Sequence, residues 1–218
     1  MSDEATTYHS NAEERANVAT HGVGAVFALV GLVAAAFATL GDGTLRLVTV
    51  VVFCSTMLLT YVASTGFHLA VGRAVKQRWR LLDHASIYLL IAGTYTPIML
   101  VAVGGAWGWS ITAAIWTMAA AGVVMKVALV GKYDQFEKLD TGLYVAMGWT
   151  CVVAIVPIWN ALSPVGMTLL VLGGAAYTAG VPFFLWEKLR HNHAIWHVFV
   201  LAGSAAHFGA VWTDVVAR

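Results

Sequence analysis

The sequence predicts an all-α integral membrane protein that folds as a bundle of seven transmembrane helices. Of its 218 residues 60% are hydrophobic and 11% are charged, with a mean hydropathy of +0.77, whereas a soluble domain carries about 25% charged residues. Apolar runs recur at the roughly 20 residues that a helix needs to cross a bilayer. The net charge of +1 and the lack of a basic patch argue against a nucleic-acid partner.

Seven apolar runs mark the expected spans, and short turn-forming sequences separate them. The runs cover residues 22–40, 47–70, 82–102, 107–129, 141–160, 167–186 and 194–214. "GDG" (41–43) ends the first run, "VGG" (103–105) the third and "NALSPVG" (160–166) the fifth, and such sequences favour turns. These connections are too short for an independent domain, so we expect residues 1–218 to form one transmembrane domain that begins with a short polar segment, 1–20.

Two of the expected spans contain proline, at Pro97 in the third and Pro182 in the sixth. Neighbouring helices satisfy the backbone groups that proline frees, so membrane helices tolerate it as a kink. We therefore expect both spans to continue through the proline.

The distribution of Lys and Arg predicts the orientation. If the spans alternate, ten basic residues lie on the side of the N-terminus and two, Arg46 and Arg218, lie on the other. Cytoplasmic connections carry the excess of Lys and Arg, so the N-terminus is expected in the cytoplasm and the C-terminus outside. The ten are Arg15, Arg73, Lys76, Arg78, Arg80, Lys126, Lys132, Lys138, Lys188 and Arg190.

With this orientation, polar residues of several spans form one layer at the cytoplasmic end. His193 and His197 are spaced i, i+4 on the seventh span, so their side chains lie on one helix face, and His68 ends the second span. Three neutral imidazoles can hold a zinc ion that keeps an open position for water. Asp83 would then hold that water or act as a general base. Ser64, one turn before His68, would orient the water or polarise a carbonyl group.

Other polar residues near this layer allow two interpretations. Glu14, Asn17 and His21 follow the spacing i, i+3, i+7 of one helix stripe, and form either a solvated face or a polar contact that supports the site. His84 lies about 100° around the helix from Asp83, which suggests a supporting position. Taken singly, each histidine is more simply a buried hydrogen-bonding residue, and His207 is expected to link two helices in this way.

Five blocks of the sequence together resemble the hemolysin III branch of the progestin and adiponectin receptor (PAQR) family. They occur in the family order and cover nearly the whole chain, and the short chain resembles a bacterial member of the inner membrane. The blocks are "EERANVATHGVGA" (13–25), "STGFHL" (64–69), "DHASIYLLIAGTYTP" (83–97), "GGAAYTAGV" (173–181) and "HAIWHVFVLAGSAAHF" (193–208).

The resemblance implies seven helices, a cytoplasmic N-terminus and a zinc ion near the cytoplasmic face. It assigns zinc to His68, His193 and His197, with Asp83 acting through water and Ser64 beside it. The family is also similar to alkaline ceramidases in this layout, which implies hydrolysis of a lipid amide with a membrane lipid as substrate or ligand.

Two other functions remain open from the sequence. One is a membrane-homeostasis or sensor protein in which zinc only joins helices. The other is a cytolytic pore, which the family name suggests, although a pore needs a polar lining through its whole depth and the polar layer lies at one end. The sequence identifies no protein partner.

Overall fold

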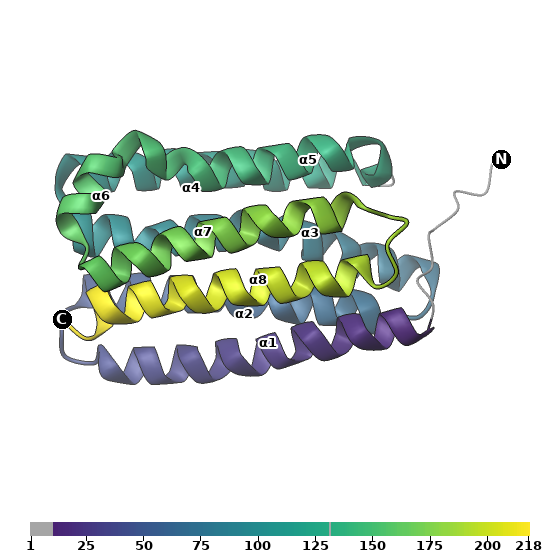
Figure 1. Ribbon diagram of the computed structural model, residues 1–218, viewed down its shortest axis with the longest axis horizontal. Helices are drawn as coiled ribbons and strands as arrows, with labels where there is room; N and C mark the ends of the chain where they lie inside the picture. The colour runs from purple at the N-terminus through teal and green to yellow at the C-terminus, as the bar shows by residue number, and fades with distance from the viewer. Residues whose placement is uncertain (1–10, 131) are drawn as a thin grey trace.

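The computed structural model describes residues 11–130 and 132–218, without the side chains of residues 133 and 134, so half of the predicted polar segment 1–20 lies outside the described residues. Within these ranges the chain is helical, and seven helical spans are long and apolar enough to cross a membrane, which confirms the predicted bundle (Figure 1). The elements are α1 (Asn11–Ala38), α2 (Thr44–Leu69), α3 (Arg73–Pro97), η1 (Ile98–Val103), α4 (Gly105–Ala128), α5 (Tyr133–Gly148), η2 (Trp149–Ala154), α6 (Ile155–Ala161), α7 (Pro164–Leu185), α8 (Asn192–Val211) and η3 (Trp212–Val216).

The spans lie side by side along one axis. The largest contacts join α2 to α3, α7 to α8 and α1 to α2, and α8 also packs on α1. Helix α1 begins at one end of the bundle and the chain finishes at the other (Figure 1). We call the first of these the histidine end, because α2 finishes there with His68 in its last turn and α8 begins there with His193 in its first turn.

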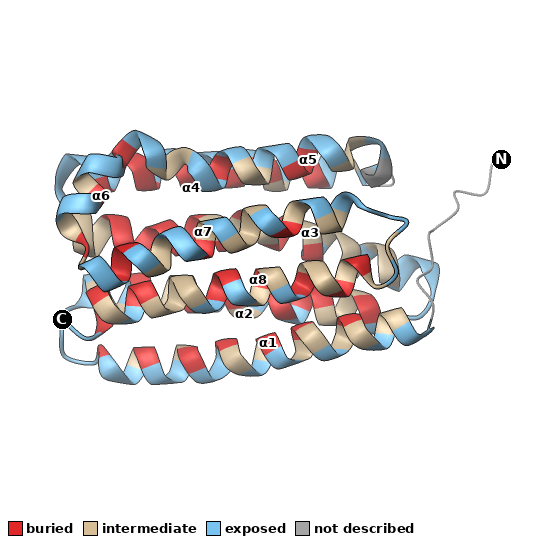
Figure 2. Ribbon diagram, in the orientation of Figure 1, coloured by how far each residue is buried: buried red, intermediate tan, exposed pale blue. Residues whose placement is uncertain are grey.

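Apolar side chains cover much of the outside of the bundle. Val23, Val26 and Val30 on α1 are more than half exposed, and Figure 2 shows exposed positions along the outer faces of the helices. A hydrocarbon environment is the natural solvent for such faces, since every backbone polar group of a helix is satisfied within the helix.

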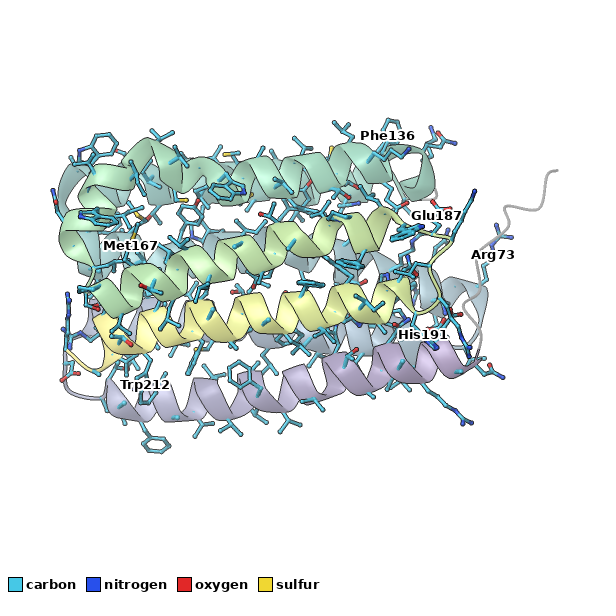
Figure 3. The ribbon with its side chains drawn as sticks, viewed as in Figure 1. Arg73, Phe136, Met167, Glu187, His191 and Trp212 are labelled. Atoms are coloured by element: carbon cyan, nitrogen blue, oxygen red, sulfur yellow. The ribbon has the colours of Figure 1, made fainter. Side chains whose placement is uncertain are left out.

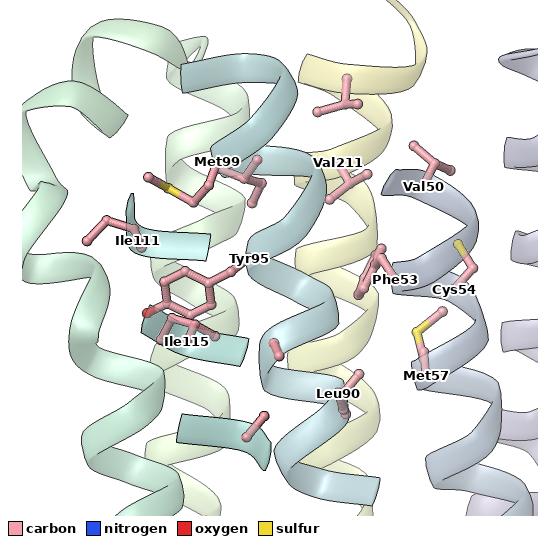
Figure 4. Packing of buried hydrophobic residues seen from close by; sticks show 14 of the residues in the cluster. Val50, Phe53, Cys54, Met57, Leu90, Tyr95, Met99, Ile111, Ile115 and Val211 are labelled. Carbon is pink, nitrogen blue, oxygen red and sulfur yellow. The ribbon is translucent and has the colours of Figure 1, made fainter. Parts of the chain in front are cut away.

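The buried core lies between α2, α3, α4 and α8. Phe53 and Met57 on α2 lie on the same side of α3 as Leu90, whereas Tyr95 points to the other side, toward Ile111 and Ile115 of α4 (Figure 4). The α2 and α3 backbones approach closely at Gly93, where an added Cβ would meet the side chain of Thr56. Small residues permit such approaches, and van der Waals contacts then hold membrane helices together.

The helix boundaries extend beyond the predicted apolar runs at the histidine end. Helix α1 begins at Asn11, eleven residues before the first predicted run, and α3 begins at Arg73, nine residues before the third. Polar residues fill these extra turns, so hydropathy alone misses them. The turn before α3 places Gly72 at φ 87°, a backbone conformation that glycine adopts without strain.

The third, fifth and seventh spans contain irregular segments, and the seventh finishes in the π-helical turn η3. After Pro97 the third span continues as the π-helical turn η1, so the proline alters the helix without ending it. Pro182 likewise lies inside α7. The fifth span passes through the 3₁₀ segment η2 before α6. There the Tyr95 hydroxyl accepts the Cys151 N–H at 2.7 Å and donates to the Gly148 carbonyl at 2.7 Å.

Candidate metal centre

Three histidine side chains meet at the histidine end. His68 lies in the last turn of α2, and His193 and His197 lie in the first turns of α8. One potential ligand atom from each lies within 4.8 Å of the others. His68 and His197 are buried, and His193 is half-buried. The structure therefore brings together the three residues that the sequence singles out, and they form a group able to hold a metal ion. We call this group the histidine triad.

Residues of helix α1 form hydrogen bonds with Nδ1 of two triad rings. His68 donates from Nδ1 to the Glu14 carboxylate at 2.6 Å. The Thr20 hydroxyl donates to backbone carbonyls of its own helix, so it accepts from Nδ1 of His197 at 3.0 Å. In both rings Nδ1 then carries the proton, which leaves Nε2 as the nitrogen with a lone pair for a metal. Metal-binding histidines usually donate their other nitrogen in this way.

The predicted α1 stripe contacts the triad at all three positions. Besides the bond that Glu14 accepts, Asn17 Nδ2 lies 3.4 Å from Nδ1 of His68. The ring of His21 stacks on His197 with centroids 3.4 Å apart and planes within 12°. Glu14 also accepts from Lys76 at 2.8 Å. Of the two interpretations of this stripe, the structure supports the contact with the site.

Asp83 and Ser64 lie beside the triad. Asp83 is 8% exposed and lines the same cavity as His193 and His197. The buried Ser64 hydroxyl lies near the Asp83 carboxylate but outside hydrogen-bond geometry. The α2–α3 turn positions both residues, because it reverses the chain between Ser64 and Asp83.

His84 occupies a different surrounding from the triad. Its Nδ1 lies 3.3 Å from Nζ of Lys126 on α4, and Lys126 forms an ion pair with Asp140 on α5. Tyr88 donates to the same Asp140 carboxylate. Sequence reasoning missed this cluster and counted Lys126 among the loop charges, whereas it is 1% exposed within the bundle. Its place inside an apolar run was the available signal, because intramembrane charges are normally paired.

Two further histidines lie apart from the triad. His191 precedes α8 with φ 57°, and its backbone N–H donates to Glu13. Figure 3 shows His191 and Glu187 at the histidine end and Met167 at the opposite end. His207 lies farther along α8 and bonds to the carbonyl of Leu170 on α7 through Nε2, at 3.1 Å, as expected for a helix-linking histidine.

A cavity connects the triad with the middle of the bundle. Its volume is about 250 Å³, and α3, α5, α7 and α8 supply most of its lining. His193, His197 and Asp83 lie at its polar end, while side chains such as Val171 and Val200 line it farther on. A molecule in this cavity would have its polar part at the triad and its apolar part among the helices.

Comparison with known proteins shows the family to which the chain belongs. Residues 9–208 match the haemolysin-III related family. Hemolysin-3 of Bacillus cereus is 44% identical over 91% of this chain and 90% of its own length, and a Hemolysin-3 homolog of Bacillus subtilis is 40% identical over 91% and 92%. The human monocyte to macrophage differentiation factor is 29% identical over 92% and 83%. With its seven apolar spans, the chain is a multi-pass bacterial membrane protein that belongs to the haemolysin-III related family.

Proposed function

We propose that this protein is a zinc-dependent hydrolase that cleaves the amide bond of a membrane lipid, a reaction of the ceramidase type. One observation carries the proposal. Three imidazoles have ligand atoms within 4.8 Å of one another, and two of them, those of His193 and His197, line a largely apolar cavity together with the buried Asp83 carboxylate. That combination suits a substrate with one polar bond and long apolar chains.

The donor set fits zinc. Imidazole nitrogen suits this ion, and catalytic sites keep three protein ligands with a fourth position for water or substrate. The hydrogen bonds that His68 donates to Glu14 and His197 donates to Thr20 favour the tautomer in which Nε2 faces the ion. His68, His193 and His197 would hold the zinc, with Asp83 bound through water.

When bound, zinc would supply a Lewis acid that activates water and polarises a carbonyl group. Asp83 would take a proton from the attacking water as a general base and deliver it to the leaving nitrogen. The water oxygen joins the carbonyl carbon, the C–N bond breaks, and a fatty acid and an amine result. Ser64 would donate a hydrogen bond either to the water or to the carbonyl oxygen. The α1 residues Glu14, Asn17 and His21, and His84 on α3, would position these groups.

The apolar cavity supports a lipid substrate. A lipid can lie with its acyl chain among α5, α7 and α8 and its amide group at the triad. Two relatives carry the name Hemolysin-3, and that name suggests cytolysis. A water-filled pathway, however, needs polar groups through its depth, and the polar lining is concentrated at the triad end of this cavity, which favours the enzyme.

Metal analysis and turnover of the purified protein test the proposal. We expect about one zinc per chain in the wild type and none in His68→Ala or His193→Ala, while His207→Gln keeps it. Asp83→Asn should retain zinc and lose about 10²- to 10⁴-fold in lipid-amide turnover. The exposed control Asp42→Asn should keep both the zinc and the turnover.

Other outcomes separate the alternatives. Zinc without turnover of any lipid amide would indicate a structural ion in a sensor or membrane-homeostasis protein. Ion flux in liposomes that is unaffected by Asp83→Asn would indicate a pore. Folded wild-type protein that binds no zinc would refute the zinc-dependent hydrolase.

A further inference from the structure

The two ring nitrogens of His207 have different surroundings. Nε2 lies 3.1 Å from the carbonyl oxygen of Leu170. A carbonyl only accepts, so in a neutral imidazole the proton is on Nε2 and Nδ1 is a hydrogen-bond acceptor. Among the described residues, nothing donates to this buried Nδ1. The helix-linking role therefore uses only one of the two ring nitrogens, Nε2.

Neighbouring side chains fix the position of the ring. An added Cβ at Gly173 on α7 would overlap Cδ2 of His207, so the glycine lets the ring lie directly against the helix. The Tyr177 ring lies 5.4 Å away between centroids, and its hydroxyl is hydrogen-bonded to Ser204 at 2.7 Å. The hydroxyl groups of Tyr177 and Ser204 are thus paired with each other.

His207 and two members of the histidine triad, His193 and His197, line one continuous cavity. His207 follows His197 by ten residues on α8, which places it about 15 Å farther along the axis. Apolar side chains such as Val200 and Val171 line the cavity as well. An acceptor buried in such a lining loses free energy unless it receives a hydrogen bond, so the cavity has a second polar point at a defined depth.

We propose that Nδ1 of His207 accepts a hydrogen bond from a hydroxyl group carried partway along the acyl chain of the bound lipid. This inference rests on the lipid orientation of the proposed function, with the carbonyl end at the triad. An extended chain gains about 1.2 Å per bond, so 15 Å corresponds to about 12 bonds. The preferred ligands are lipids with a mid-chain hydroxyl, near the twelfth carbon.

Competition binding tests this preference without requiring turnover. The assay measures how well three competitors displace a fluorescent fatty acid from the purified protein. The competitors are octadecanoic acid, 12-hydroxyoctadecanoic acid and 2-hydroxyoctadecanoic acid. We expect the 12-hydroxy acid to bind about 2- to 10-fold more tightly than octadecanoic acid, the effect of one net hydrogen bond. The 2-hydroxy acid controls for added polarity and should gain nothing at His207.

A matched pair of variants separates the ligand role from the helix-linking role. His207→Gln keeps an N–H near the position of Nε2 for the Leu170 carbonyl but has no acceptor at Nδ1. It should melt close to the wild type and bind both acids equally. His207→Leu removes both groups and should lose both the preference and part of the stability.

Two results would overturn the inference. One is equal binding of the 12-hydroxy and unsubstituted acids to the wild type, which would leave the proposed hydrolase intact. The other is a preference that survives in His207→Gln. If neither acid displaces the fluorescent probe, the lipid orientation itself is wrong, and the proposed function fails together with this site.

Discussion

The buried ion pair between Lys126 and Asp140 leads to a prediction about stability. The two side chains join α4 to α5 and belong to residues that are 1% and 3% exposed. Removing one partner of a buried pair costs about 3–5 kcal/mol, whereas replacing both by apolar residues is neutral or stabilising by about 1–4 kcal/mol. We expect Lys126→Met and Asp140→Leu each to destabilise the protein by that first amount, and the double variant to be at least as stable as the wild type.

The surroundings predict which single variant is worse. Glu137 also acts on Lys126, so it partly replaces Asp140 in Asp140→Leu. In Lys126→Met, by contrast, two carboxylates remain together, and the hydrogen bond from Tyr88 to Asp140 offsets only part of that cost. Lys126→Met should therefore cost more.

Unfolding of the detergent-solubilised protein by SDS, followed by circular dichroism, measures these free energies. Single variants that each cost less than about 1 kcal/mol, the value of an exposed pair, would refute the reasoning. A double variant whose cost equals the sum of the two single costs would refute it as well, because the cycle would then detect no coupling.

Three further predictions concern α1, η2 and the α2–α3 contact. Glu14→Gln should weaken zinc binding by about 10- to 100-fold, measured against a competing chelator, because the carboxylate orients His68. Tyr95→Phe should lower the free energy of unfolding by about 1–3 kcal/mol, because the backbone N–H of half-buried Cys151 in η2 and the carbonyl of Gly148 lose their partner. Gly93→Ala should lower it by about 1–3 kcal/mol through overpacking. Gly22→Ala, where the space is open, should raise it by about 0.5–1 kcal/mol.

Each of these predictions has a contradicting result. Unchanged zinc affinity in Glu14→Gln, beside the matched control Asp42→Asn, would mean that His68 needs no support from α1. A free energy of unfolding of Tyr95→Phe equal to that of the wild type would mean that the hydroxyl does not stabilise the irregular fifth span. Equal effects of the two alanine variants in unfolding measurements would mean that α2 and α3 have room for a methyl group at Gly93.

The sequence alone predicts the seven spans and the histidine triad. Apolar length is a strong signal because the bilayer leaves few alternatives for the backbone. The triad is predictable because the i, i+4 spacing fixes His193 relative to His197, and alternation of the spans brings the end of the second to the same depth as the start of the seventh. Depth along a helix follows directly from residue number.

The direction in which a side chain points around the helix axis is harder to predict. His84 and Asp83 are adjacent in sequence, yet His84 lies against Lys126 and Asp83 lies beside Ser64. Which neighbour a residue meets depends on how the helices pack, and a single sequence does not give those angles. The hydrogen bond between Thr20 and His197 could not be predicted for the same reason. Hydropathy did not indicate the early start of α1, because Glu14 and Asn17 in its first turns are polar residues that contact His68.

The order of the triad along the chain has a consequence for biosynthesis. His68 leaves the ribosome early, and its companions His193 and His197 come 125 or more positions later. During synthesis Glu14 and His68 therefore wait in a partly inserted protein until the last helix enters the bilayer. The group that could hold a metal ion is complete only when the chain is nearly complete, so a chain truncated before the last helix lacks two of its three histidines.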